Sequence, residues 1–194
     1  MKSEIGSSIM NSNAVRIRVS DDGDRTHILA IHRDAFGDDE GPVIANLVEE
    51  MLADPTGEPI FSLVAELGDN LVGHVLFTSV TVERNNEVSA QILAPLAVAS
   101  DQHGHGIGSQ LLQEGFAHLQ QSGVELVFVL GYPDYYSRFG FAPAGVRGFQ
   151  APYPILPKNA DAWMVYELAS GAIERYEGII RCSKALDHPQ YWQE

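Results

Sequence analysis

The chain has 194 residues, of which 45% are hydrophobic and one is a cysteine. This length suits one globular domain with a substantial core, and a single cysteine excludes an internal disulfide framework and suits a reducing cytoplasm. The formal net charge of −14 argues against nucleic acid as a partner, because proteins bind phosphate backbones through clusters of Lys and Arg. Since no apolar run approaches the ~20 residues of a membrane span, we expect a cytoplasmic protein.

The first third of the chain predicts a strand followed by two helices. Residues 1–13 are rich in Ser and Asn and lack both a basic start and a long apolar stretch, so we expect a flexible arm rather than a signal peptide. Alternating apolar residues predict a strand over residues 15–19. Asp21 and Asp24 then introduce a helix that ends near Phe36, and residues 42–52 form another.

Three strands are predicted next, over residues 60–66, 70–82 and 88–99. The first two are paired across a turn that contains Gly68 and Asp69. The third strand contains Pro95, which removes a hydrogen-bond donor and therefore marks a bulge, a bend or an edge position.

The remainder of the chain predicts a helix over 106–121, a strand over 124–130, a Pro- and Gly-rich loop over 143–157 and a strand over 163–168. Residues 187–194 show no clear pattern. Because neither a repeat nor a linker is found, we expect one α+β domain over residues 14–194, with its core at about 14–180.

The most informative segment is the glycine-rich junction between the strand 88–99 and the helix 106–121. The first turn of a helix presents unpaired N–H groups at the positive end of its dipole, and glycine lets a diphosphate approach the backbone closely. A dinucleotide-binding fingerprint that starts at Gly104 would need glycine at Ser109, and one that starts at Gly106 would need glycine at Leu111. A P-loop would need a lysine here, and residues 3–157 contain none.

Two motifs in order resemble the GNAT superfamily of N-acetyltransferases. The pattern His103-x-x-Gly106-x-Gly108 is similar to the family's pyrophosphate loop, usually Gln/Arg-x-x-Gly-x-Gly/Ala, from which His103 departs. The family's Tyr-x-x-x-Gly-Phe signature is matched by Tyr136, Gly140 and Phe141, here within the run Pro-x-Tyr-Tyr-x-Arg-Phe-Gly-Phe that resembles a bacterial subgroup of predicted N-acetyltransferases. The resemblance extends over roughly residues 14–178.

This resemblance implies an acyl-CoA N-acyltransferase fold with an α/β sandwich-like arrangement. Its central mixed, mostly antiparallel sheet is flanked by helices and splayed between the fourth and fifth strands, where the pantetheine arm of acetyl-CoA is received. The implied activity is transfer of an acetyl group from acetyl-CoA to a primary amine of a small molecule or protein, by direct attack in a ternary complex. No metal, nucleic acid or membrane partner is expected, and a homodimer is left open.

The resemblance also implies roles for particular residues. Main-chain groups of Leu96, Ala97 and Val98 would pair with the pantetheine amides. Tyr136 would contact the cofactor and protonate the CoA thiolate, since a phenol with a pKa of ~10 can donate to a thiolate of similar basicity. The pyrophosphate would be bound by His103, Gly104, His105, Gly106, Ile107, Gly108 and Ser109.

Several of these side chains also have a purely structural interpretation. Tyr136 is either the acid or an aromatic residue packed beside its neighbours, and Tyr135 competes with it for the catalytic role. His74, in an apolar strand, is either an amine base or a hydrogen-bonded core residue. No motif supports Cys182 as an acylated nucleophile. His103 and His105 lack the spaced Cys or carboxylate partners of a metal site.

Acidic residues at 38–40 are either a solvated charge run or part of the acceptor pocket, and a cationic amine suits the acidic chain. Two functions stay open. The favoured one is the acetyl-CoA-dependent N-acetyltransferase, supported by the position of Tyr136. The alternative is a non-catalytic acyl-CoA-binding sensor or regulator on the same fold, favoured by His103 in place of Gln or Arg and by the lack of an evident general base.

Overall fold

The computed structural model describes residues 14–192, so the predicted arm over residues 1–13 lies outside the described part. The helices in this part are α1 (Arg25–Ala53), α2 (Ile107–Gln121), α3 (Pro133–Tyr136) and α4 (Ala172–Arg175). The strands are β1 (Val15–Val19), β2 (Phe61–Leu67), β3 (Asn70–Val82), β4 (Asn85–Val98), β5 (Leu126–Leu130), β6 (Ala142–Pro143), β7 (Phe149–Gln150), β8 (Trp163–Glu167) and β9 (Gly178–Arg181).

The main sheet has the strand order β1-β2-β3-β4-β5-β8-β6. Only β4 and β5 run parallel along this path; the other neighbours are antiparallel. The short strand β9 pairs with the C-terminal end of β3, at Thr81 and Val82, and also with β7. The mixed, mostly antiparallel sheet implied by the resemblance is therefore confirmed, and so are the predicted strands along β1–β5 and β8. The pairs that involve β7 and β9 were not predicted.

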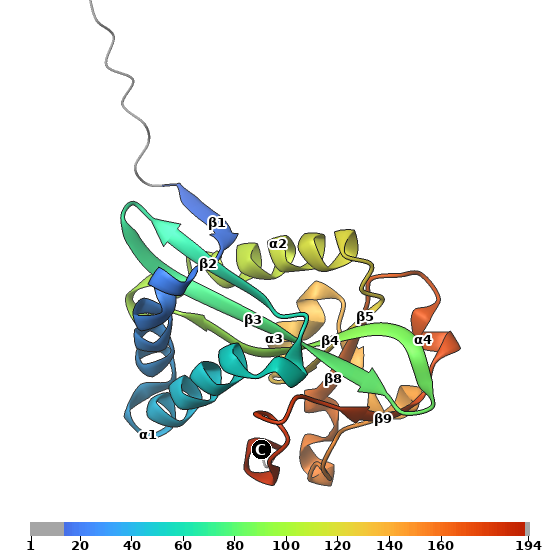
Figure 1. Ribbon diagram of the computed structural model, residues 1–194. Helices are drawn as coiled ribbons and strands as arrows, with labels where there is room; N and C mark the ends of the chain where they lie inside the picture. Colours follow the sequence, from blue (N-terminus) through green and yellow to red (C-terminus); the bar gives the residue numbers. More distant parts are fainter. Residues whose placement is uncertain (1–13, 193–194) are drawn as a thin grey trace, which may run out of the picture.

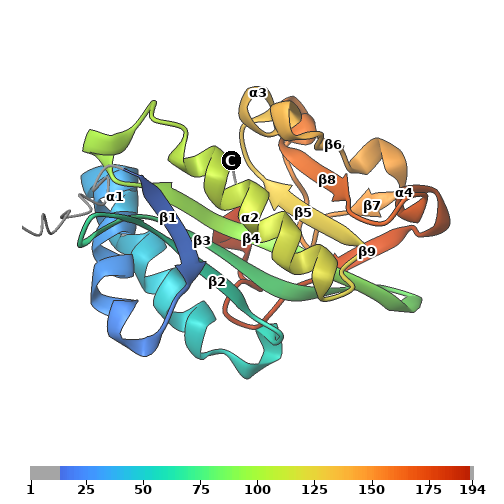
Figure 2. The ribbon, with the colours of Figure 1, turned by 90° about the horizontal axis from the view of Figure 1, so that it is seen from above.

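Helices α1 and α2 cover opposite faces of the sheet (Figures 1 and 2). Because side chains alternate along a strand, neighbouring residues of β3 belong to different halves of the core. Leu76 packs in the cluster that contains Met51 of α1, and Phe77 packs in the cluster that contains Leu111 of α2. Gly115 lets α2 lie close to the sheet, since a Cβ there would be 2.7 Å from the ring of Phe77.

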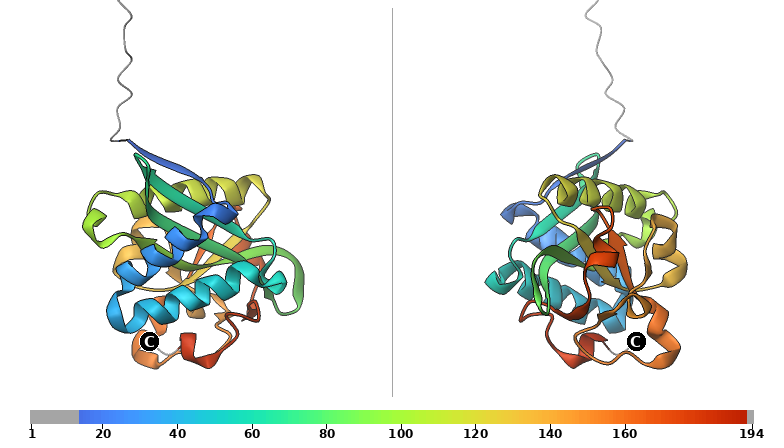
Figure 3. Two further views of the ribbon diagram at one scale, coloured as in Figure 1. Left: turned by 60° about the vertical axis from the view of Figure 1, so that its left-hand side comes forward. Right: turned by 90° about the vertical axis from the view of Figure 1, so that its right-hand side faces the viewer.

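Helix α1 is broken at Gly37, which has φ +73° and ψ −175°. The two helices predicted from the sequence are thus confirmed as the two halves of α1, and they run in different directions in Figure 3. The second half passes so close to the first that a Cβ at Gly41 would collide with the carbonyl oxygen of Arg33. The break turns residues 36–43 toward the open part of the sheet.

The sheet opens between β4 and β5. Their parallel pairing runs from Ala90–Leu126 to Leu93–Val129, while β4 continues to Val98. On its other edge, β4 changes register against β3 just beyond Leu93, with one extra residue in the part that contains Pro95. Since proline cannot donate a ladder hydrogen bond, the predicted bulge forms there. The splay expected between the fourth and fifth strands is confirmed.

The C-terminal segment, for which no pattern was found, returns to the core. Trp192 is 2% exposed, its indole N–H donates to the carbonyl of Leu186 over 3.1 Å, and its ring meets that of Trp163 edge-on. Leu186 and Trp192 belong to the main hydrophobic cluster, so the core extends past the expected limit near residue 180. Within residues 14–192, no helix combines the length and apolarity needed to cross a membrane.

Candidate active site

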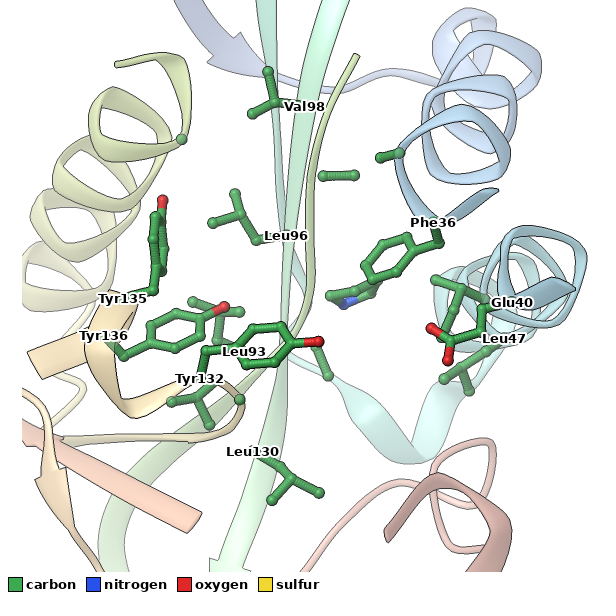
Figure 4. A pocket seen from close by; sticks show the side chains of 18 of the residues that line it. Phe36, Glu40, Leu47, Leu93, Leu96, Val98, Leu130, Tyr132, Tyr135 and Tyr136 are labelled. Carbon is green, nitrogen blue, oxygen red and sulfur yellow. The ribbon is translucent and has the colours of Figure 1, made fainter. Parts of the chain in front are cut away.

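A cavity of about 880 Å³ lies where the sheet opens (Figure 4). Its walls come from α1, the end of β4, the loop before α2, the segment after β5 and the C-terminal turn. Ten of the predicted cofactor-binding residues line this cavity, and only His105 does not. The ten are Leu96, Ala97, Val98, His103, Gly104, Gly106, Ile107, Gly108, Ser109 and Tyr136.

The hydrogen-bond pattern of β4 decides which main-chain groups face the cavity. The N–H of Ala99 donates to the carbonyl of Val72 in β3 over 2.9 Å. Since hydrogen-bonded and non-hydrogen-bonded pairs alternate along an antiparallel ladder, the main chain of Ala97 also faces β3. The main chains of Leu96 and Val98 face the opposite way, into the gap. Of the three residues predicted to pair with pantetheine, only Leu96 and Val98 present main-chain groups to the gap.

The loop after β4 has the backbone of an anion site. Gly104 and Gly106 have φ of +80° and +76°, a region that side-chain-bearing residues rarely adopt. Gly106 directly precedes α2. The N–H groups of Ile107, Gly108 and Ser109 belong to the first helical turn and have no acceptor within the helix, so they are available to a bound anion.

Both histidines of the loop are held by main-chain carbonyls. Nε2 of His103 donates to the carbonyl of Val98 over 2.8 Å, and Nδ1 of His105 donates to that of Gln102 over 3.2 Å. The first bond ties the loop to the end of β4, and the second lies within the loop. In the part of the chain that the structure describes, no three His, Cys, Asp or Glu residues are grouped to hold a metal ion.

Asp34 of α1 anchors the same loop, a role that sequence reasoning did not assign. Its carboxylate accepts from the N–H of Ser100 over 2.6 Å and from the Ser100 hydroxyl over 3.0 Å. Asp34 and Ser100 are 66 positions apart in the sequence, and no local sequence pattern predicts their contact. The bond fixes the first turn after β4 against the helix that forms the opposite wall.

The adjacent tyrosines point in different directions (Figure 4). Tyr136 is 9% exposed and its hydroxyl is directed into the cavity. Its ring lies against the end of β5, where a Cβ at Gly131 would be 2.5 Å from it. The hydroxyl of Tyr135 reaches the start of α2 instead, within 2.6 Å of where a Cβ of Gly108 would be.

The surroundings of Tyr135 include one cation. The guanidinium of Arg138 lies over the Tyr135 ring, 4.8 Å from its centroid. Burial raises the pKa of the Tyr135 phenol, and the charge of Arg138 partly offsets that rise. Tyr135 therefore stays protonated near neutral pH and is placed to donate a hydrogen bond at the anion site.

His74 is a core residue and does not line the cavity. Its Nδ1 lies 2.7 Å from Nε2 of His32, and its Nε2 lies 2.9 Å from the hydroxyl of Ser62, which accepts from Ser20. Burial lowers the pKa of His32 to about 4 and that of His74 well below its usual value. Of the two interpretations of His74, the hydrogen-bonded core residue is confirmed.

Cys182 also lies outside the cavity lining. Burial raises the pKa of its thiol to about 12, which leaves little thiolate at neutral pH. The structure adds lining residues that sequence reasoning missed, because they come from distant segments without a motif. They are Phe36, Val43 and Leu47 of α1, Tyr132 after β5, and Leu186 and Tyr191 near the C-terminus.

Comparison with known proteins identifies the family to which this chain belongs. The acetyltransferase (GNAT) domain model matches residues 16–144. The uncharacterized N-acetyltransferase YjhQ of Escherichia coli K12 is 38% identical over 167 residues, which cover 85% of this chain and 90% of YjhQ. The uncharacterized N-acetyltransferase YhbS of the same strain is 32% identical over 165 residues, with 84% and 93% covered.

Two solved structures are similar in fold. The crystal structure of E. coli YhbS in complex with CoA has a TM-score of 0.79 and 30% identity, over 90% of this chain and 92% of that one. A GNAT family acetyltransferase from Brucella melitensis in complex with acetyl-CoA has a TM-score of 0.71 over 90% of this chain and 99% of that one, and at 23% identity it shows the fold alone. The chain therefore belongs to the GNAT superfamily of acetyltransferases.

Proposed function

We propose that this protein transfers an acetyl group from acetyl-CoA to a primary amine. The observation that carries the proposal is the meeting of three parts in one cavity: the open edge of β4, the start of α2 and the hydroxyl of Tyr136. The E. coli relative YhbS was crystallised with CoA, and the Brucella neighbour with acetyl-CoA. Acetyl-CoA supplies the activated thioester, and the residues of this chain bind it and move protons.

The cofactor would extend from the open sheet edge to the helix start. Leu96 presents both its N–H and its carbonyl to the gap, and Val98 presents its N–H, so a pantetheine chain can pair with β4 as an added strand. The pyrophosphate would lie at the N–H groups of Ile107, Gly108 and Ser109, where the helix dipole favours negative charge. In a chain with a net charge of −14, these main-chain donors matter more than side-chain cations.

The reaction needs a neutral amine, a polarised carbonyl and a protonated leaving group. The amine nitrogen forms a bond to the acetyl carbon, the carbon–sulfur bond breaks, and the phenol of Tyr136 gives its proton to the departing sulfur. The amine releases one proton to solvent, and the Tyr136 phenolate regains one from solvent. A main-chain N–H of β4 aimed at the carbonyl oxygen would stabilise the charge that develops there.

Thiol release from acetyl-CoA across a panel of amines tests this proposal. We expect Tyr136→Phe to lower kcat by about 10²-fold or more, as for loss of a general acid, while CoA still binds with wild-type affinity. Tyr135→Phe is the matched control: its hydroxyl lies at the anion site, so it should weaken CoA binding and leave kcat largely unchanged. If the two variants exchanged these effects, Tyr135 would be the acid.

The same assay separates an enzyme from a non-catalytic acyl-CoA sensor. A sensor would bind CoA tightly and release no thiol with any amine, and Tyr136→Phe would change nothing measurable. That result would overturn the enzymatic proposal.

A further inference from the structure

We infer that the acceptor is a small primary amine with an apolar body about the size of an aromatic ring and without a carboxylate group. The inference rests on the proposed function, because it concerns the part of the same cavity that the cofactor leaves open. It comes from three features of the cavity walls: the sign of their charge, their exposed apolar side chains and their closure by the C-terminal segment.

Charged side chains of opposite sign lie on opposite walls of the cavity. Arg138 is the only Lys or Arg among its described lining residues, and it lies beside Tyr135 on the cofactor side. Asp39 and Glu40 line the α1 wall. Figure 4 shows Glu40 reaching in from α1, across from Tyr132 and Tyr136. An incoming ammonium group is favoured at the α1 wall and loses a proton to solvent before the neutral amine attacks, whereas a carboxylate on the acceptor would be repelled there.

Large apolar side chains are exposed at the mouth of this cavity. Tyr132 is 81% exposed and Val43 is 49% exposed, although both line the cavity. Phe36, which is half-buried, continues the apolar α1 wall beside Glu40 (Figure 4). Apolar surface left open to water is stabilised when a ligand covers it, and aromatic walls favour a ring over a polar chain. An acceptor with only polar atoms would leave this surface uncovered.

The C-terminal segment forms a further wall. Leu186, Tyr191 and Trp192 line the cavity, and Trp192 is fixed in the core. The acceptor part is thus bounded by α1, by the segment after β5 and by this turn. Such a bounded space suits a compact molecule better than the end of a protein chain, which would need an open groove.

Two amines that differ by one carboxylate provide the sharpest test: 2-phenylethylamine and L-phenylalanine. With the full chain and acetyl-CoA, we expect kcat/KM for 2-phenylethylamine to exceed that for L-phenylalanine by at least about tenfold, which corresponds to ~1.4 kcal/mol. The double variant Asp39→Asn/Glu40→Gln should reduce this ratio severalfold, mainly by raising KM for 2-phenylethylamine. Glu50→Gln, on the exposed side of the same helix and outside the cavity, should leave the ratio unchanged.

The apolar wall is tested with ethanolamine, spermidine and a short peptide with a free N-terminus. Each should be a poorer acceptor than 2-phenylethylamine, and Tyr132→Ala should lower kcat/KM for 2-phenylethylamine more than for ethanolamine. Preference for spermidine or the peptide, or a phenylalanine discrimination that the double variant leaves intact, would overturn the inference while the acetyltransferase proposal stands. CoA binding without acetylation of any amine would overturn both.

Discussion

We predict that the buried histidine pair makes this protein sensitive to mild acid. His32 and His74 are both fully buried, and the hydrogen bond between them links α1 to β3. Nδ1 of His32 is buried without a hydrogen-bond partner in the described part of the chain. The pair therefore stays neutral in the native state, because protonation would place a charge in the core without an acidic partner at hydrogen-bond distance.

The sign and size of the predicted loss of stability in acid follow from the linkage between proton binding and folding. In the unfolded chain His32 takes up a proton below about pH 6.5, whereas in the native state its pKa is about 4. Acid therefore stabilises the unfolded state, and stability is lost as the pH falls from 6.5 toward 4. From His32 alone, the free energy of unfolding should be about 2 kcal/mol lower at pH 5 than at pH 7. His74, whose pKa is also lowered, adds to this loss.

Urea unfolding at pH 7 and pH 5 measures this difference. Trp163 and Trp192 are buried, so their fluorescence reports unfolding at the low protein concentration needed near the isoelectric point of about 4.7. The double variant His32→Leu/His74→Leu removes both partners at once, and its stability should depend much less on pH over this range. His27→Gln, an exposed histidine on the same helix, should keep the wild-type dependence. If the double variant lost as much stability as the wild type, the buried pair would not be the acid-sensitive group.

Three further substitutions probe how the cavity is held open. Asp34→Ala removes the anchor of Ser100 and should weaken CoA binding about fivefold in calorimetry. Asp34→Asn should retain part of the wild-type affinity. Equal affinity for wild type and Asp34→Ala would contradict the anchoring role. Gly108→Ala places a Cβ within 2.6 Å of the Tyr135 hydroxyl, so it should weaken CoA binding, and Tyr135→Phe in that background should recover some affinity. In Gly41→Ala, the added Cβ would collide with the main chain of Arg33 at the break in α1, so the free energy of unfolding should fall by about 2 kcal/mol or more in urea titrations. An unchanged midpoint would show that the two halves of α1 can move apart without a loss of stability.

What could be predicted from the sequence depends on short-range patterns. The strands were predictable because their alternation is local, and the bulge at Pro95 was predictable because proline removes one donor. The glycine loop was predictable because positive φ is needed at Gly104 and Gly106, where other residues are strained. Each of these constraints acts within a few residues of the position that reveals it.

The rest of the site depends on contacts between distant segments. The bond between Asp34 and Ser100 and the one between His32 and His74 join residues that are 66 and 42 positions apart. The C-terminal turn lies against the core because Trp192 packs against Trp163. No local sequence pattern distinguishes Trp192 from an exposed tryptophan. The acceptor wall was least predictable for the same reason, since α1, Tyr132 and the C-terminal turn meet only in the folded chain.

The departure of His103 from the family's usual loop residue has a structural consequence for cofactor binding. Its side chain donates to the carbonyl of Val98, one of the main-chain groups that face the gap. That carbonyl has two acceptor positions, and one is used to hold the loop against β4. We propose that a pantetheine chain pairs chiefly with Leu96, whose N–H and carbonyl both face the gap and are not engaged by His103. His103 thus holds the loop by a contact within the protein, and in the proposed complex the pyrophosphate would be bound by the N–H groups that begin α2.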